Sequence, residues 1–380
     1  MTAVMENRAD GAVTSEAECD SQELRRAVGL VNRVFPTRAV GVVEVTGGGG
    51  VWLTGAYGDT ELSVRLPGTV TERFGRAGVY CRAFRAAVDA LPKGTVRIEV
   101  RGGVLRLTGG AATVDVPLFA PGDPVERGEP IADCPFGAED LREALDAVAF
   151  AAYRKDNERW PLQGVHIAMD ENGITFAATD THRLAVRRFP DAADHRASVI
   201  LPNAGAKLAR ALVADAEGPA ELLIRQAADG RRTLEIAGDT FTLTVGGIAG
   251  VYPAYERIIP EGYAARLVLD REAFAAAVQA VAPAAAADIN RALLRTEGGK
   301  LWITAAGDKQ AQAQASVSCG GALADSVAFN CRYLLDGLKA CGGDTVSLGV
   351  NGPASAACLW PGNTSAPGDY LYLLMPMRPA

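Results

Sequence analysis

The chain has few of the residues on which metal and nucleophile chemistry depends. Its 380 residues include only three histidines, His166, His182 and His195, which are far apart in the sequence. No HExxH motif, HxH motif or His/Cys cluster offers the spacing of a metal site, and neither a Walker loop nor a GxSxG motif occurs. We therefore expect no cofactor, no metal ion and no catalytic residues.

Cysteine pairs and long apolar runs are also missing. The seven cysteines are scattered without a CxxC pair, which indicates reduced, buried thiols. No apolar stretch approaches the roughly 18 residues that span a bilayer, and the polar, acidic residues 1–20 do not resemble a secretory signal. We expect a flexible leader over residues 1–20, a cytoplasmic location and no membrane partner. The net charge of −7 argues against nucleic-acid binding over the whole surface but allows a local basic stripe.

A glycine-rich run, VTGGGG at residues 45–50, is the one segment that resembles a phosphate-binding loop. It lies between two alternating, strand-like runs, whereas a phosphate cradle opens a helix. The context therefore favours a hairpin turn.

Residues 179–188, TDTHRLAVRR, hold the histidine in the most conspicuous setting. On a strand, Asp180 and His182 would point to one face and could form an acid–base pair, although no nucleophile stands beside them. The alternative is a strand end that shapes a binding surface, and the residue types leave both interpretations open. His166 alternates with apolar residues and is expected to be a strand residue with a polar partner, while His195 lies in a polar run.

Repetition is the strongest structural signal in the sequence. Six segments rich in Ala and Leu carry apolar residues at i, i+3, i+4 and i+7, as Leu24, Val28 and Val31 show, which predicts helices with one buried face. Successive segments are about 60 residues apart, roughly one supersecondary unit. They begin at Glu23, Arg82, Glu139, Ala204, Arg271 and Cys331.

Short alternating stretches punctuated by Gly follow each helix and predict antiparallel hairpins. The repeating unit is thus one helix and three or four strands, with the longer helix in odd-numbered units. Two units make a domain of about 120 residues. Pro- and Gly-rich linkers are expected at 120–135 and 258–266. The predicted fold is α+β, with a leader at 1–20 and three duplicated domains at 21–131, 132–262 and 263–380.

Four motifs resemble, in the same order, segments of the bacterial beta sliding clamp family, the processivity subunit of DNA polymerase III. They are FAATDTHRLAVRR, GGIAGVYPAYERIIP, AFNCRYLLDGLKA and the C-terminal YLYLLMPMRPA, and the resemblance extends over residues 20–380. It implies the DNA-clamp fold: a head-to-tail homodimeric ring of six domains that encircles duplex DNA. Such a clamp tethers the polymerase without making or breaking a bond, so it is no enzyme.

The resemblance also implies a hydrophobic pocket for short motifs of the DNA polymerase III alpha subunit, the clamp loader, other DNA polymerases and repair proteins. In this assignment Asp180 holds a strand end, Thr179, Arg183 and Leu184 face the peptide, and Arg183 joins other arginines at the rim. Methionines offer an adaptable surface that many peptides can share. The implied pocket residues are Leu162, Thr179, Thr181, His182, Arg183, Leu184, Pro253, Arg257, Ile258, Leu373, Met375, Pro376, Met377 and Arg378.

Two further surfaces follow from the resemblance. Basic residues on or beside the six helices would hold double-stranded DNA through its phosphates, without sequence readout. The implied DNA-binding residues are Arg25, Arg26, Arg33, Arg82, Arg85, Arg154, Arg159, Lys207, Arg210, Arg332 and Lys339. The implied dimer interface sets Val104, Leu105 and Leu107 of one copy against Phe274, Val278 and Gln279 of the other.

The sequence departs from the family pattern at several positions, among them Thr181, Asn203 and Gln279. These departures leave a second interpretation open, a specialised clamp paralogue that is insensitive to an inhibitor or serves a special polymerase. A third interpretation, from a different class, is a monomeric peptide-binding module without a ring.

Overall fold

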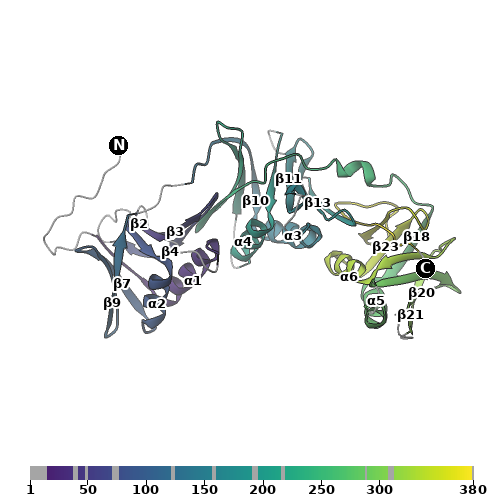
Figure 1. The fold of residues 1–380 in the computed structure, drawn as a ribbon, viewed down its shortest axis with the longest axis horizontal. Helices are drawn as coiled ribbons and strands as arrows, with labels where there is room; N and C mark the ends of the chain where they lie inside the picture. Colours follow the sequence, from purple (N-terminus) through teal and green to yellow (C-terminus); the bar gives the residue numbers. More distant parts are fainter. Residues whose placement is uncertain are drawn as a thin grey trace. The chain divides into compact units, whose positions relative to one another are not determined.

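The computed structural model describes residues 15–36, 42–47, 50–70, 77–120, 125–155, 160–190, 196–214, 219–286, 289–306 and 312–378. The chain divides into two compact units that alternate along the sequence (Figure 1). The first covers residues 1–138 and 207–247, and the second covers residues 139–206 and 248–380.

The first unit is built on one continuous antiparallel sheet. Its strands lie in the order β10-β15-β16-β17-β4-β3-β2-β6-β9-β8-β7-β1-β5. The strands are β1 Ser15–Asp20, β2 Val42–Gly47, β3 Val51–Tyr57, β4 Thr60–Leu66, β5 Gly68–Val70, β6 Ala77–Tyr80, β7 Thr95–Arg101, β8 Val104–Gly109, β9 Ala112–Phe119, β10 Glu129–Gly137, β15 Pro219–Gln226, β16 Arg232–Gly238 and β17 Phe241–Gly246. Its helices are α1 Ser21–Val31, followed by the 3-10 turn η1 Asn32–Val34, and α2 Cys81–Ala90.

The second unit contains a sheet of the same kind, in the order β14-β11-β12-β13-β25-β24-β23-β18-β21-β20-β19-β22. The strands are β11 Gly164–Asp170, β12 Gly173–Thr179, β13 Arg183–Phe189, β14 Ala197–Pro202, β18 Ala265–Asp270, β19 Arg291–Glu297, β20 Lys300–Ala306, β21 Gln312–Gly320, β22 Val327–Asn330, β23 Thr345–Val350, β24 Ala357–Pro361 and β25 Tyr370–Leu374. Its helices are α5 Arg271–Ala285 and α6 Cys331–Ala340, with 3-10 turns η2 Ala149–Ala151, η3 Trp160–Leu162 and η4 Tyr255–Ile258. The helices α3 Ala138–Val148 and α4 Asn203–Val213 run across the division between the units.

The same five elements recur six times along the chain. Each repeat is a strand, a helix and three strands, from β1-α1-β2-β3-β4 to β22-α6-β23-β24-β25. All six helices lie where the apolar periodicity predicts them, and α1 packs beside α2 as α5 packs beside α6 (Figure 1). The predicted α+β fold of repeated helix-and-hairpin units is confirmed. The sequence did not reveal the strand before each helix, and α3 and α4 are equally long, against the expected alternation.

Local side chains explain where several helices begin. Asp20 accepts hydrogen bonds from the backbone N–H groups of Gln22 and Glu23 at the start of α1. Asp270 caps α5 and Asn330 caps α6 in the same way. Such caps satisfy donors that have no partner inside the helix, typically worth about 1 kcal/mol each.

Two predicted irregular segments are partly strands. Residues 15–20 of the expected leader form β1, which pairs with β5 and β7, while residues 1–14 lie outside the described residues. The expected linker 120–135 contains the start of β10, which pairs along its length with β15. The glycine-rich run does connect two paired strands, because Gly47 of β2 lies opposite Val51 of β3.

Candidate functional site

The segment that raised the acid–base question is a tight turn between β12 and β13. One oxygen of Asp180 accepts hydrogen bonds from the backbone N–H groups of His182 (3.0 Å) and Arg183 (3.1 Å). The Thr179 hydroxyl donates to the Arg183 carbonyl (2.6 Å) and accepts from the Thr181 N–H (3.1 Å). Asp180 and His182 are therefore turn residues and do not share a strand face. The carboxylate is occupied in shaping the turn, which supports the binding-surface interpretation.

Arg183 is the anchor of this turn. Its guanidinium pairs with Asp180 at 2.9 Å and with Asp336 of α6 at 2.6 Å, and it donates to the Phe150 carbonyl at 2.9 Å. It also lies over the Tyr333 ring, 4.4 Å from the centroid. Burial alone lowers its pKa, but the partners more than offset burial, so the pKa is raised and the side chain stays charged.

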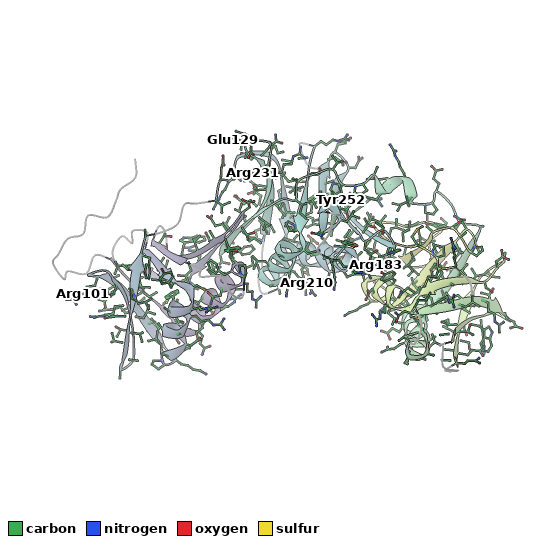
Figure 2. All side chains as sticks on the ribbon, viewed as in Figure 1. Arg101, Glu129, Arg183, Arg210, Arg231 and Tyr252 are labelled. Carbon is green, nitrogen blue, oxygen red and sulfur yellow. The ribbon has the colours of Figure 1, made fainter. Side chains whose placement is uncertain are left out.

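The prediction that Arg183 frames an open rim is wrong, because its side chain is 8% exposed and its donors are taken by these partners. Thr179 and Leu184 are buried as well, so they do not face solvent in this structure. These residues form the support under a surface, and Figure 2 shows Arg183 within the second unit.

Thr181, at the tip of the turn, has a left-handed backbone with φ of 79°. This conformation is unfavourable for a β-branched residue, since Cβ approaches the backbone closely. Asn290 is the other non-glycine residue with positive φ among those the structure describes. Strain is thus stored at the tip of the turn.

The C-terminal segment runs from β25 past this turn and is held at both ends. The Met375 N–H donates to the His182 carbonyl (2.9 Å), and the Met377 N–H donates to the Ala328 carbonyl of β22 (2.7 Å). The Arg378 carbonyl accepts a bond from the Arg291 guanidinium. Backbone hydrogen bonds therefore hold Met375 beside the turn and Met377 beside β22.

A second segment, 248–259, covers the same part of the sheet. Tyr252 and Tyr255 pack into one buried cluster with Leu162, Leu184 and Leu373, three of the implied pocket residues. The Tyr252 hydroxyl accepts a hydrogen bond from the Thr179 N–H at 3.1 Å, and so ties this segment to the turn (Figure 2).

Apolar side chains remain exposed above this cluster. Val251 is 89% exposed, Ile258 51% and Met375 41%. Apolar side chains that are exposed singly are common on protein surfaces, so their exposure alone does not define a binding surface. The pocket assignment had included Ile258 and Met375 but missed Val251 and Tyr252, although both adjoin the predicted Pro253 in the VYPAYERI run.

The implied pocket residues thus separate into two sets. The buried set is Leu162, Thr179, Arg183, Leu184 and Leu373; the exposed or half-buried set is Thr181, His182, Pro253, Arg257, Ile258, Met375, Pro376, Met377 and Arg378. We call the exposed or half-buried apolar side chains of 251–258 and 375–377 the docking surface, and the buried set supports it.

The implied DNA-binding residues lie on or next to helices, except Arg159, which lies outside the described residues. Those that are exposed are Arg26, Arg33, Arg82, Arg85, Arg154, Lys207, Arg210 (labelled in Figure 2), Arg332 and Lys339. Arg25 is instead half-buried and donates to the Leu91 carbonyl at the end of α2. Its guanidinium joins α1 to α2 and is not presented for DNA.

One helix does not fit the expected basic surface. The exposed charged side chains of α3 are Glu139, Asp140, Arg142, Glu143 and Asp146, four acids and one base. None of the implied DNA-binding residues lies on α3 itself, and its exposed face is mainly acidic. Phosphate attraction, where it occurs, must come from the other helices.

The implied dimer residues are mostly core residues. Leu105, Leu107, Phe274 and Val278 are completely buried inside their own units. Their burial contradicts an interface role, because an interface side chain must be accessible in the single chain. The sequence pattern alone does not show which of two apolar faces packs into the core. Of the two strands that pair with β8, the one that exposes more of its residues is β9.

No cofactor or metal site stands out in the described part of the chain. It contains no group of three or more His, Cys, Asp or Glu side chains that could hold a metal ion, and none of its helices is long and apolar enough to cross a membrane. Six of the seven cysteines are buried, as expected, and Cys319 is partly exposed.

Comparison with known proteins agrees with these features. The chain is 27% identical over 375 residues to a beta sliding clamp of Pseudomonas putida, a match that covers 96% of this chain and 99% of the relative. The crystal structure of the DNA polymerase III beta subunit from Pseudomonas aeruginosa superposes with a TM-score of 0.87 at 24% identity, covering 96% of this chain and all of that one. A sliding clamp from the same organism bound to griselimycin gives a TM-score of 0.85 at 24% identity, covering 97% and 100%.

Two family models match along most of the chain. The central domain of the DNA polymerase III beta subunit matches residues 136–254, and its C-terminal domain matches residues 256–378. With the repeated fold and the fixed C-terminal methionines already described, these matches lead to one conclusion: the chain belongs to the DNA polymerase III beta subunit family, the bacterial beta sliding clamps.

Proposed function

We propose that this protein is a DNA sliding clamp, a ring of two copies that encircles duplex DNA and tethers DNA polymerase III. The observation that carries the proposal is the way sheets continue from one repeat to another. The last strand of the first repeat, β4, pairs with the last strand of the fourth, β17, and β13, the last strand of the third repeat, pairs with β25, the last strand of the sixth.

Completing this rule requires a second molecule. The last strand of the fifth repeat is β21, and its counterpart is β9, the last strand of the second repeat. Among the described residues, 112–117 of β9 pair only with β8, and 312–318 of β21 pair only with β20, so each strand has an open edge. The pattern of exposure along β9 (112–119) recurs along residues 313–320 of β21. Open edges pair readily with another chain, and β9 of one copy with β21 of the next closes a head-to-tail ring.

The two intramolecular pairs also suggest the register. In each, the first five residues of one strand lie antiparallel to the first five of the other: 60–64 with 241–245, and 183–187 with 370–374. Transferred to the open edges with the inward faces matched, this arrangement sets 112–116 against 313–317 and places Val114 opposite Ala315. These residues replace the implied interface residues that are buried.

Cysteine cross-linking tests the ring. Val114→Cys with Ala315→Cys in one chain should give a covalent dimer on mild oxidation, and no higher oligomers, because a closed ring pairs both open edges. The pair Val114→Cys with Arg295→Cys, the latter on an exposed part of β19, is the control. Size-exclusion chromatography should give about twice 39.6 kDa. A monomer without cross-links would favour the alternative, a monomeric peptide-binding module.

The exposed arginines and lysines of the helices would hold DNA by its phosphates without reading sequence, which permits sliding. Because α3 is acidic, this contact should be weak on that helix. We infer further that the protein catalyses no reaction itself, acts in the cytoplasm and comprises three domains at 21–131, 132–262 and 263–380.

The docking surface would bind short motifs of the polymerase alpha subunit, the clamp loader and other polymerases and repair proteins. Its exposed apolar side chains supply contact area and its methionines allow different sequences to pack. Met375→Ala with Met377→Ala should abolish binding of a peptide copied from the polymerase alpha tail, while Tyr57→Ala, an exposed aromatic of the first unit, should not. Equal binding by both variants would refute the assignment.

Griselimycin provides a second probe of the same surface, because a clamp of the same fold binds it. A specialised paralogue that is insensitive to inhibitors remains the alternative to a replicative clamp. Strong binding of labelled griselimycin that the polymerase peptide displaces would support the replicative clamp. Peptide binding without griselimycin binding would support the insensitive paralogue.

A further inference from the structure

His166 lies beneath the docking surface, among aromatic rings. It belongs to β11, where Val165 and Ile167 point to the opposite face and are completely buried. Its ring stacks on Tyr252 with centroids 4.8 Å apart and planes 6° apart, and it meets the Tyr255 ring edge-on at 6.2 Å. Its strand neighbours, Ala177 and Ile200, belong to the same buried cluster.

This stack connects to both parts of the docking surface. The Tyr252 hydroxyl accepts the Thr179 N–H, and so holds the turn that receives the Met375 N–H. Tyr255 begins η4, the turn that presents Ile258 to solvent. A shift of the His166 ring would therefore displace both the turn at 179–183 and η4.

One ring nitrogen of His166, which is half-buried, lacks the polar partner that the sequence predicts. Its Nδ1 atom is buried and has no hydrogen-bond partner among the described residues. A neutral imidazole tolerates an unbonded acceptor better than a cation tolerates a buried, unbonded donor, because the charged form loses more hydration. Stacking on a tyrosine face does not replace that hydration in full.

Charged groups around the stack act in both directions. Burial lowers the pKa of His166, and Glu256 raises it by a smaller amount. The charged groups near Tyr255 are Glu256, Arg188 and Asp170, and the charged group near Tyr252 is Asp180. Burial is the main cause that raises the pKa of both tyrosines, so both hydroxyls stay neutral.

The sign of the resulting pH effect follows from linkage. A histidine whose folded pKa lies below its unfolded value, about 6.5, contributes stability above that value and loses it as the pH falls through the folded pKa. Acidification therefore loosens the native stack.

We propose that His166 is a positioning residue for the docking surface, and that protonation of its imidazole weakens the binding of partner peptides in mildly acidic solution. The proposal rests on the peptide-binding function proposed above. His166 touches no partner; it acts by holding Tyr252 and Tyr255 in place. In the limit where only the neutral form binds, affinity falls roughly tenfold for each pH unit below the titration midpoint.

The test measures affinity for the polymerase alpha-tail peptide and for labelled griselimycin between pH 8 and 5.5, on the full-length dimer. The chain has only three histidines, so three single variants separate their contributions. His166→Phe keeps an aromatic ring for the stack and removes the titration, whereas His182→Asn and His195→Asn remove the other two imidazoles. His166→Ala removes ring and titration together.

The wild type should lose affinity on acidification, while His166→Phe should bind normally at pH 8 with a flat profile. His182→Asn and His195→Asn should keep the acid-dependent loss, whatever their affinity at pH 8. His166→Ala should bind weakly at every pH, which separates positioning by the ring from simple titration.

If the wild type binds at pH 8 and its affinity does not change with pH, the role of His166 is refuted. The same holds if His166→Phe loses as much affinity on acidification as the wild type. Neither result would refute the docking surface itself. No binding of either probe at any pH would overturn the docking surface as well. Circular dichroism at each pH confirms that every variant stays folded over the range compared.

Discussion

Replacement of Arg183 by Met should destabilise the second unit strongly. The substitution keeps much of the apolar stem but removes the charge that faces Asp180, whose side chain is only 12% exposed. Breaking a buried ion pair typically costs about 3–5 kcal/mol, because the remaining charge loses its partner. The bond to Asp336 adds little, since that carboxylate is half exposed and water can solvate it.

Asp180 also keeps two backbone N–H donors, which places the expected loss near the lower end, at about 3 kcal/mol. The second unit covers residues 139–206 and 248–380, a size at which each kcal/mol shifts the melting temperature by about 2–4 °C. Scanning calorimetry of the full chain should therefore show a transition lowered by about 6–12 °C.

A surface ion pair provides the matched control. Arg196 lies 2.8 Å from Glu171, but both side chains are about 70% exposed, so Arg196→Met should cost at most about 1 kcal/mol. Adding Asp180→Asn to Arg183→Met should recover part of the loss by removing the uncompensated charge. A melting temperature for Arg183→Met equal to that of the control would refute the account of Arg183 as a buried anchor.

One substitution to glycine tests the backbone strain at Thr181, and one substitution of glycine, with a matched control, tests the packing of α6. Thr181→Gly should stabilise the protein by about 1 kcal/mol in chemical denaturation, because glycine adopts the left-handed conformation without strain; a loss of stability would contradict the strain at this turn. Gly337→Ala in α6 should destabilise by about 1–3 kcal/mol, since a Cβ would lie 2.2 Å from the Tyr372 ring. Gly29→Ala in α1 meets nothing within 4 Å and should stabilise by up to about 1 kcal/mol, so equal effects of the two substitutions would refute the packing argument.

The helices could be predicted from the sequence because their signals are local. Leu24, Val28 and Val31 repeat at helical spacing, and all three are buried on one face of α1. The strand before α3, β10, has nine residues and escaped notice because it overlaps a Pro- and Gly-rich run that favours a linker. The strands β6 and β22 escaped notice because they are short, with four residues each. No period can be recognised in four residues.

The candidate site could be predicted in part. The motif resemblance found the turn and the C-terminal methionines, but it assigned Arg183 to a rim. Its partner Asp336 is 153 residues away in the sequence, and no local pattern links two such residues. The dimer residues failed for a related reason: Leu105 and Leu107 alternate as an interface strand would, and only the fold shows that they face inward.

The acidic face of α3 sets this chain apart from a uniformly positive ring. Glu143 pairs with Arg187 of β13 at 2.9 Å and Glu139 with Arg142 at 3.4 Å, so part of the charge is neutralised locally. DNA contact should therefore depend on the remaining helices, and its affinity should decrease steeply with salt.

The central claim is that the protein holds DNA by encircling it, which a topological measurement tests most directly. The protein is loaded onto a nicked circular duplex by the cognate clamp loader, and DNA-bound protein is isolated by gel filtration at high salt. The account predicts that it remains on the circle and is released when a restriction enzyme linearises the DNA. Equal retention on circular and linear DNA, or no retention on either, would contradict the account.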